Sequence, residues 1–212
     1  MASKGAAFLF TVLAGASCRT AAGAGPPTPI VQPGAPGGPS RVIAAEQAVD
    51  LSKVQHTTAD ARFMQGMIGH HAQALEMAAL LPSRTDREDM KLLAKRLEVS
   101  QADEIGMMRE WLQLRGRDVP DAHAHHAHGA ALMPGMLTPE EMTRLADAKG
   151  AEFDRLFLEG MIKHHEGALT MVQELFSSPG AGQEADIYAF ASDVDADQRM
   201  EIDRMRAMLS GR

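Results

Sequence analysis

The chain has 212 residues, enough for one domain of ordinary size with a tail. Because 45% of the residues are apolar but only 4% are aromatic, we expect a core of aliphatic and methionine side chains, which suits packed helices better than a sheet. The formal net charge of −7, without any cluster of Lys and Arg, argues against nucleic-acid binding.

The N-terminus has the pattern of an export signal. Lys4 precedes an apolar run over residues 6–16, which is too short to span a bilayer but typical of a signal peptide. Small residues then lead to Cys18, the only cysteine, in a pattern that resembles a bacterial lipoprotein signal. We therefore predict a signal over residues 1–18 and a location in the cell envelope, the periplasm or on the extracellular surface of a bacterium. Cys18 is either lipidated, which would be the only attachment to a membrane, or incidental to an ordinary cleavage site.

A tether rich in proline and glycine follows over residues 19–55. Its first part, residues 19–40, has no hydrophobic periodicity and almost no charge, so we expect it to be disordered.

The remaining chain contains an internal repeat. The segment "FMQGMIGHHAQALEM" (residues 63–77) returns 94 residues later as "FLEGMIKHHEGALTM" (residues 157–171), with nine of fifteen positions identical. Further along, five residues recur at an offset of 97: Gln101, Glu104, Ile105, Met108 and Leu112 return as Gln198, Glu201, Ile202, Met205 and Leu209. Each half is thus the same unit of two helices joined by a short turn.

Periodicity and capping patterns predict where the helices lie. The first covers residues 59–81 and is ended by Pro82; "TDRE" at residues 85–88 is a capping box that begins the second. The third and fourth cover residues 151–177 and 184–209, and "TPEE" at residues 138–141 begins a short extra helix between the halves. We predict an all-α four-helix bundle over residues 56–212, with repeat one at 57–115, a linker at 116–150 and repeat two at 151–210.

Histidines and methionines share one face of the first and third helices. Met64, Met67, His70, His71 and Met77 fall within an arc of about 140° at 100° per residue. Met161, His164, His165 and Met171 repeat this face, with Leu158 in the place of Met64. If the first turn centres near residues 83–84, Gln101, Glu104 and Met108 lie beside residues 63–67, one turn below the histidines.

Imidazole and thioether together suit Cu(I), and by the same softness Ag(I), better than cations that prefer oxygen. The predicted ligands are His70, His71, His164 and His165 with Met67 and Met161, followed by Met64, Met108 and Met205. Two alternatives stay open: the histidines form a structural hydrogen-bond network, or the methionines only fill the core.

The linker carries a second metal-binding pattern, "HAHHAH". Its histidines, His123, His125, His126 and His128, would bind Cu(II) or Zn(II) through imidazole without needing a fold. The alternative is a hinge of low complexity with no role.

The strings "ADARFMQGMIGHHAQALEMA", "SQADEIGMMREWL", "MPGMLTPEEM" and "FDRLFLEGMIKHHEGALTM" resemble the ferritin-like bacterial family catalogued as domain of unknown function 305, over essentially all of residues 56–210. The resemblance implies a ferritin-like four-helix bundle, a location in the cell envelope and, for some members, copper binding. Carried over to this chain, the implied positions are Met67, His70, His71, Met161, His164 and His165.

The function that we expect is sequestration or delivery of copper without catalysis. Delivery would require a copper-trafficking protein as partner, and the sequence leaves a homo-oligomer open. One alternative is an envelope bundle that binds a partner and no metal. Another is a di-iron oxidoreductase, for which Glu104 and Glu201 lack the histidine three residues on that such sites use.

Overall fold

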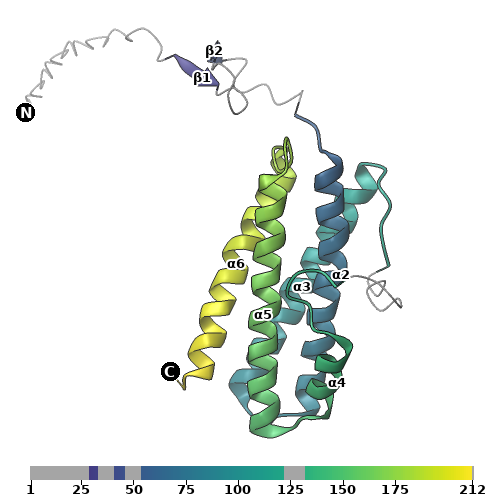
Figure 1. The fold of residues 1–212 in the computed structure, drawn as a ribbon, viewed down its shortest axis with the longest axis vertical. Coiled ribbons are helices and arrows are strands. Elements are labelled where there is room, and N and C mark those ends of the chain that lie inside the picture. Colours follow the sequence, from purple (N-terminus) through teal and green to yellow (C-terminus); the bar gives the residue numbers. More distant parts are fainter. Residues whose placement is uncertain (1–28, 33–40, 46–53, 122–131, 212) are drawn as a thin grey trace, which may run out of the picture. The chain divides into compact units, whose positions relative to one another are not determined.

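The structure, a computed structural model, describes residues 29–32, 41–45, 54–121 and 132–211 (Figure 1). The predicted signal with Cys18 and the linker histidines His123, His125, His126 and His128 lie outside these residues. The chain divides into two units, Met1–Asp50 and Leu51–Arg212.

The first unit contains a two-stranded antiparallel sheet. Strand β1 (Ile30–Gln32) pairs with β2 (Arg41–Ile43), and Val31 lies opposite Val42. The expectation of disorder throughout residues 19–40 is therefore wrong at β1. Both strands consist mainly of β-branched residues, which favour extended backbone and pair across a sheet. The prediction misses them because it is based on the overall Pro/Gly-rich composition of the segment.

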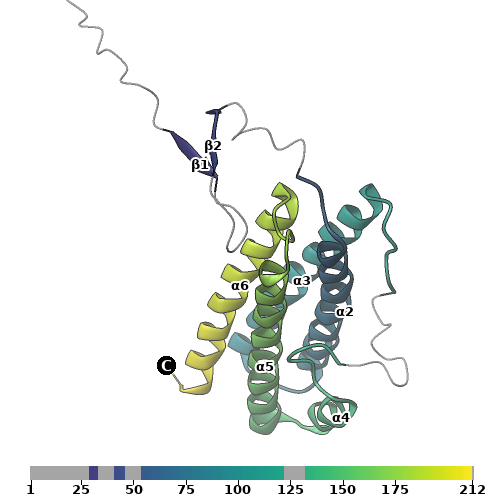
Figure 2. The same ribbon diagram turned by 45° about the horizontal axis from the view of Figure 1, so that its top comes forward.

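The second unit is built from helices α2 (Thr58–Leu80), α3 (Glu88–Leu114), α4 (Pro139–Asp147), α5 (Gly150–Ser177) and α6 (Ala185–Leu209), with a 3₁₀ turn, η1 (Leu81–Ser83), after α2. Figures 1 and 2 show α2, α3, α5 and α6 running alongside one another, and α4 at the end of the bundle opposite to the end of α3. The predicted bundle of two helical hairpins joined by a long linker is confirmed. None of the helices in the described ranges is long and apolar enough to cross a membrane.

Local sequence explains two of the helix starts. The Thr57 hydroxyl accepts from the backbone N–H of Asp60, whose carboxylate accepts from the N–H of Thr57, so α2 begins with a capping box. Thr138 and Glu141 form the same box on α4, as the "TPEE" pattern predicts.

The capping box predicted at residues 85–88 is wrong. Helix α3 begins only at Glu88, after an extended Arg87 that makes no side-chain cap. The backbone N–H of Thr85 bonds to the carbonyl of Leu81, and its hydroxyl accepts from the N–H of Arg87 at 3.2 Å, so Thr85 stabilises the turn and not the helix.

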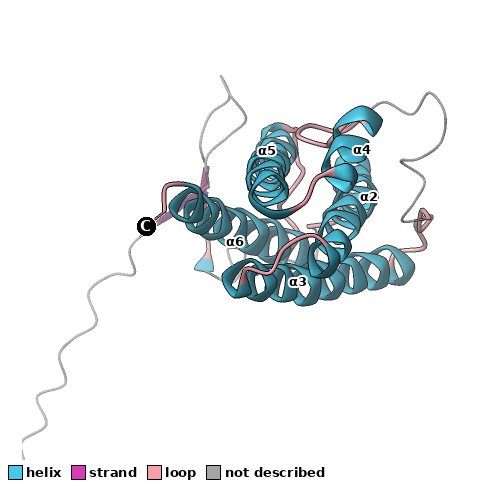
Figure 3. Cartoon of the chain, turned by 90° about the horizontal axis from the view of Figure 1, so that it is seen from below, coloured by secondary structure: helices cyan, strands magenta, loops and turns pink. Residues whose placement is uncertain are grey.

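Helix α2 packs along α3, α5 along α6, and α2 against α5. The view along the bundle shows α4 outside the four long helices, where it packs against α5 and α2 (Figure 3). The core is aliphatic and methionine-rich as expected; side chains with no exposed surface include Met67, Met77, Met90, Met108, Met161 and Met205. This packing places the histidine-bearing helices next to each other in the interior.

Candidate metal site

The four predicted histidines lie in the interior of the bundle, His70 and His71 on α2 and His164 and His165 on α5. None exposes more than 1% of its surface. The rings of His70 and His164, which are equivalent in the repeat, meet across the α2–α5 contact with centroids 3.8 Å apart and planes 37° apart. The structure therefore brings one histidine of each repeat into direct contact.

The other two histidines each bind a carboxylate from the second helix of their own hairpin. The His71 Nε2 lies 2.5 Å from Oε2 of Glu104 on α3, and the His165 Nε2 lies 2.6 Å from Oε2 of Glu201 on α6. An ionised carboxylate only accepts hydrogen bonds, so each Nε2 donates, and in the neutral imidazole each Nδ1 then carries the ring's lone pair. The two repeats thus orient their second histidine in the same way.

His70 and His164 are oriented by backbone carbonyls. The His70 Nε2 donates to the carbonyl of Pro134, and the His164 Nε2 donates to the carbonyl of His70, both at 3.0 Å. As a result, Nδ1 of His71, His164 and His165 is buried and has no hydrogen-bond partner within the described residues. A buried polar atom left without a partner costs about 1–3 kcal/mol, and a bound metal ion would satisfy it.

Burial also sets the protonation of the site. It lowers the pKa of His164 well below the ordinary value of 6.5, and the neighbouring His70 and His165 lower it further. For Glu104, burial raises the pKa, but the hydrogen bond and the charge of His71, together with the hydrogen bond from Ser100 and the charge of His165, lower it below the ordinary value of 4.5. Histidine binds metals in its neutral form, so the burial of His164 favours the form that can act as a ligand.

A segment of the linker, "MPGML" at residues 133–137, closes the site between α2 and α5. Besides the Pro134 carbonyl bound by His70, the side-chain amide of Gln73 on α2 donates to the Leu137 carbonyl at 3.0 Å and accepts from the Leu137 N–H at 2.8 Å. Gly135 has φ +75°, and a Cβ on Gly167 of α5 would lie 1.9 Å from the Pro134 oxygen. Segment 133–137 therefore contacts both helices, and at its contact with α5 only glycine fits at positions 135 and 167.

The predicted methionine ligands are all buried, but they are not gathered in one place. Met64, Met67 and Met108 belong to one apolar cluster of the core, and Met161 and Met205 belong to another. Their burial is compatible with a role as ligands, and it equally suits residues that fill the core.

Glu104 and Glu201 are not among the ligands predicted from the sequence. The sequence predicts that Glu104 lies one turn below the histidines, whereas the structure places its carboxylate beside His71. Side chains on a helix lean toward the N-terminus of their own helix, so His71 and Glu104, on antiparallel helices, lean toward each other and meet. The signal that could have found both was their recurrence at an offset of 97 beside the histidine repeat.

Another repeated pair lies beside these carboxylates in sequence. Gln101 and Gln198 are buried, and both side-chain polar atoms of Gln101 and the Oε1 of Gln198 have no hydrogen-bond partner in the described part of the chain. Within that part, no three His, Cys, Asp or Glu side chains lie close enough together to hold a metal ion. An ion at this site would therefore need thioether ligands or a change of side-chain rotamers.

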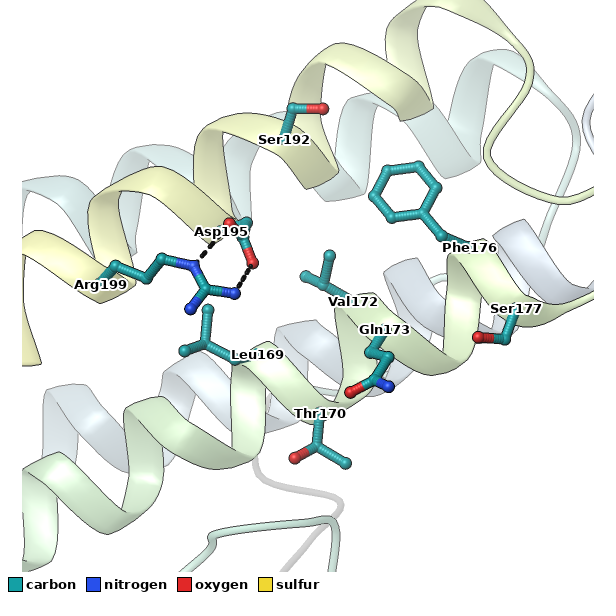
Figure 4. A pocket seen from close by; sticks show the side chains of 9 residues that line it. All are labelled: Leu169, Thr170, Val172, Gln173, Phe176, Ser177, Ser192, Asp195 and Arg199. Atoms are coloured by element: carbon teal, nitrogen blue, oxygen red, sulfur yellow. Dashed lines mark hydrogen bonds and ion pairs between the residues drawn. The ribbon is translucent and has the colours of Figure 1, made fainter.

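Away from the histidines, a groove lies between α5 and α6. It has a volume of about 670 Å³, and Figure 4 shows Leu169, Val172 and Phe176 on α5 facing the Asp195–Arg199 ion pair on α6. None of its lining residues is a predicted ligand.

Comparison with known proteins gives a family and several related structures. The model of the family described as "Domain of unknown function (DUF305)" matches residues 60–209. A DUF305 protein from Streptomyces coelicolor, described as a candidate secreted protein, is 30% identical with a TM-score of 0.63, over 72% of this chain and 93% of that one. A DUF305 fragment from Deinococcus radiodurans is 28% identical with a TM-score of 0.64, over 74% of this chain and 99% of that one.

The protein CopM in its Cu(I)-bound form is 27% identical with a TM-score of 0.57, over 74% of this chain and 98% of that one. CopM structures with Cu(II) and with Ag bound match to a similar degree. No curated protein matches the chain.

Proposed function

We propose that this chain, which belongs to the DUF305 family, binds copper as Cu(I), with Ag(I) as a chemical substitute, through buried imidazoles and thioethers of its bundle. The observation that carries the proposal is the set of three buried Nδ1 atoms, on His71, His164 and His165, that have no hydrogen-bond partner in the described residues while the opposite ring nitrogen of each is fixed. The structures of the similar CopM with Cu(I), Cu(II) and Ag support this choice of ion.

The chain's own residues would prepare the ligands before the ion arrives. Glu104 and Glu201 hold His71 and His165 in the tautomer whose Nδ1 lone pair is available, and burial keeps His164 neutral. Copper would supply the coordination that satisfies the buried nitrogens, with Met67 and Met161 as the first thioether candidates.

The role that follows is sequestration or delivery of copper outside the cytoplasm. Export would depend on residues 1–18, with Cys18 as a lipid anchor, and the similarity to a candidate secreted protein supports export. The linker histidines His123, His125, His126 and His128 would collect Cu(II) or Zn(II) loosely. For delivery, a copper-trafficking protein would be the partner.

The test is a paired replacement that preserves the carboxylate contacts. In a His71→Gln/His165→Gln variant, the amide nitrogen of each glutamine stands near the former Nε2 and can still donate to Glu104 or Glu201, but the Nδ1 lone pairs are lost. We expect Cu(I) affinity, measured by competition with a chelator, to fall sharply while the melting temperature of the metal-free protein changes little. A variant with all four linker histidines replaced by Ala is the control, and it should keep the tight Cu(I) affinity.

The alternative is a purely structural network, and one observation favours it: each of the four Nε2 atoms already has a hydrogen-bond partner. On this alternative the double glutamine variant and the wild type would bind Cu(I) equally, or neither would bind it. Either result would refute the copper proposal.

A further inference from the structure

The repeat places two glycines at equivalent positions, Gly66 on α2 and Gly160 on α5, each one turn before the histidine pair. A Cβ on Gly66 would lie 3.3 Å from the sulfur of Met133 and 3.4 Å from the methyl carbon of Met171. On Gly160 it would lie 3.2 Å from a methyl carbon of Leu137 and 3.3 Å from that of Met77. Both glycines thus leave room for a side chain of the linker and a methionine of the facing helix.

Met77 and Met171 are themselves equivalent in the repeat, so only the linker makes the two sides different. It contributes the thioether of Met133 at Gly66 and the hydrocarbon side chain of Leu137 at Gly160. The sulfur of Met133 and the methyl end of the Met171 thioether therefore approach the same point on the Gly66 side, whereas the other side has a single thioether against an apolar group. Two thioethers that converge on one point suit a soft monovalent ion.

The Gly66 side is open to solvent. Met133, which is half-buried, and Met171, which is 8% exposed, line a cavity of about 340 Å³ together with Arg62, Phe63 and Glu174. The equivalent cavity beside Gly160 has a volume of about 180 Å³, and no methionine lines it. The Lys163–Glu141 ion pair, at 2.7 Å, borders that second cavity.

This cavity also adjoins the histidines. Pro134, the residue after Met133, lines it, and the carbonyl of Pro134 accepts the hydrogen bond from His70. An ion held by the thioethers would lie beside the backbone that orients the His70–His164 pair. The cavity therefore connects solvent to the edge of the buried site.

We propose that Met133 and Met171 form a thioether site for Cu(I) or Ag(I) at the mouth of the bundle, from which the ion passes to the buried imidazoles. Gly66 is the residue that lets the two side chains converge. The proposal rests on the proposed function for the class of ion, but its ligands are different residues.

The test uses the full chain labelled with ¹³C at its methionine methyl groups and titrated with Ag(I), which needs no reductant. The methyl signals of Met133 and Met171, assigned from Met133→Leu and Met171→Leu variants, should shift with the first additions. The Met133→Leu variant should bind one Ag(I) fewer than the wild type, and Ag(I) should no longer shift the Met171 signal. Met77→Leu removes the equivalent methionine from the Gly160 side, and this variant should bind as many Ag(I) ions as the wild type.

A second pair of variants tests the geometry without removing sulfur. Gly66→Ala should weaken Ag(I) binding at this site because its Cβ displaces Met133. Gly160→Ala introduces a similarly tight contact against Leu137 and should leave the number of bound ions unchanged. Equal effects of the two alanines would overturn the assignment.

The two proposals can fail separately. A Met133 signal that stays in place up to saturation would overturn the thioether site, even if the double glutamine variant loses Cu(I) affinity as the proposed function requires. If instead the Met133 signal shifts while that variant binds Cu(I) normally, the thioether site stands and the buried imidazole site fails.

Discussion

His71 and His165 are held alike, each by a carboxylate that lies on the partner helix of its own hairpin. The first members of the two pairs are held differently, since His70 binds the linker at Pro134 and His164 binds the backbone of His70. At the scale of single residues, the carboxylate contacts thus follow the repeat and the carbonyl contacts do not. We infer that the His–Glu pairs are the part of the site that the duplication preserved.

The carboxylates give a prediction about metal affinity. In a Glu104→Gln/Glu201→Gln variant the amide oxygens can still accept from the imidazoles, but the negative charge that raises their basicity is gone. Since loss of such a partner typically costs 10–100-fold in metal affinity, we expect a weakening of about that size in a Cu(I) competition titration. Glu110→Gln, an exposed change on the same helix, is the control and should have no effect.

At the scale of elements, the linker breaks the symmetry of the repeat. Where α2 has Gln73, which makes two hydrogen bonds to Leu137, α5 has Gly167, on which the Pro134 carbonyl rests. One linker cannot contact two equivalent helices in the same way, so the two positions have different residues. In the sequence, Gln73 and Gly167 stand at equivalent positions of the repeat but are not identical. The structure explains the difference by their different contacts with the linker.

The close approach at Gly167 gives a stability prediction. Gly167→Ala would put a Cβ 1.9 Å from the Pro134 oxygen, so segment 133–137 must move or α5 must shift. We expect a loss of about 1–3 kcal/mol in the free energy of unfolding, the usual cost of overpacking, measured by chemical denaturation.

The control for this change is Gly106→Ala, at an exposed position in the middle of α3. A Cβ there would meet no atom within 4 Å, so the better helix propensity of alanine should stabilise the protein by about 0.5–1 kcal/mol. Loss of stability in both variants would show that a general intolerance of the helices to Gly→Ala, and not the linker contact, is responsible.

At the scale of the whole molecule, the two hairpins are tied to each other at their ends. The Asp60 carboxylate at the start of α2 accepts from the N–H of Gly182 in the α5–α6 turn at 2.7 Å. The N–H of Gly150 at the start of α5 donates to the carbonyl of Arg84 in the α2–α3 turn, also at 2.7 Å. Both hydrogen bonds lie within residues 51–212, and so do the two apolar clusters that form the core of the bundle.

A truncation tests this independence. We compare a protein that consists of residues 51–212 with one that consists of residues 19–212. Their melting temperatures should be the same, and so should their helical circular dichroism signals when each is divided by the number of residues in the bundle. The short sheet of β1 and β2 exposes Val31 and Val42, so it adds little buried apolar surface. A marked fall in melting temperature on truncation would show that the first unit contributes to the stability of the bundle.

Much of the fold could be read from the sequence because its signals are local. Helical periodicity, the stop at Pro82 and the "TPEE" cap each depend on a few neighbouring residues, and the repeat showed that the two halves share one design. The same local rules put four histidines on the inner faces of two helices, where the structure has them. A pattern of this kind specifies which face of a helix is buried.

What the sequence could not decide is which side chains meet across helices. That depends on how side chains lean across neighbouring helices: His71 and Glu104 lie on antiparallel helices, and each leans toward the N-terminus of its own helix and therefore toward the other. The contacts of the linker were equally out of reach, since Met133 and Gly66 lie far apart in sequence and meet only where the linker crosses α2 and α5. The sequence by itself determined the helices and their inner faces; the tertiary structure decided the partners, because contacts between elements depend on the register of whole helices and on where a long linker packs.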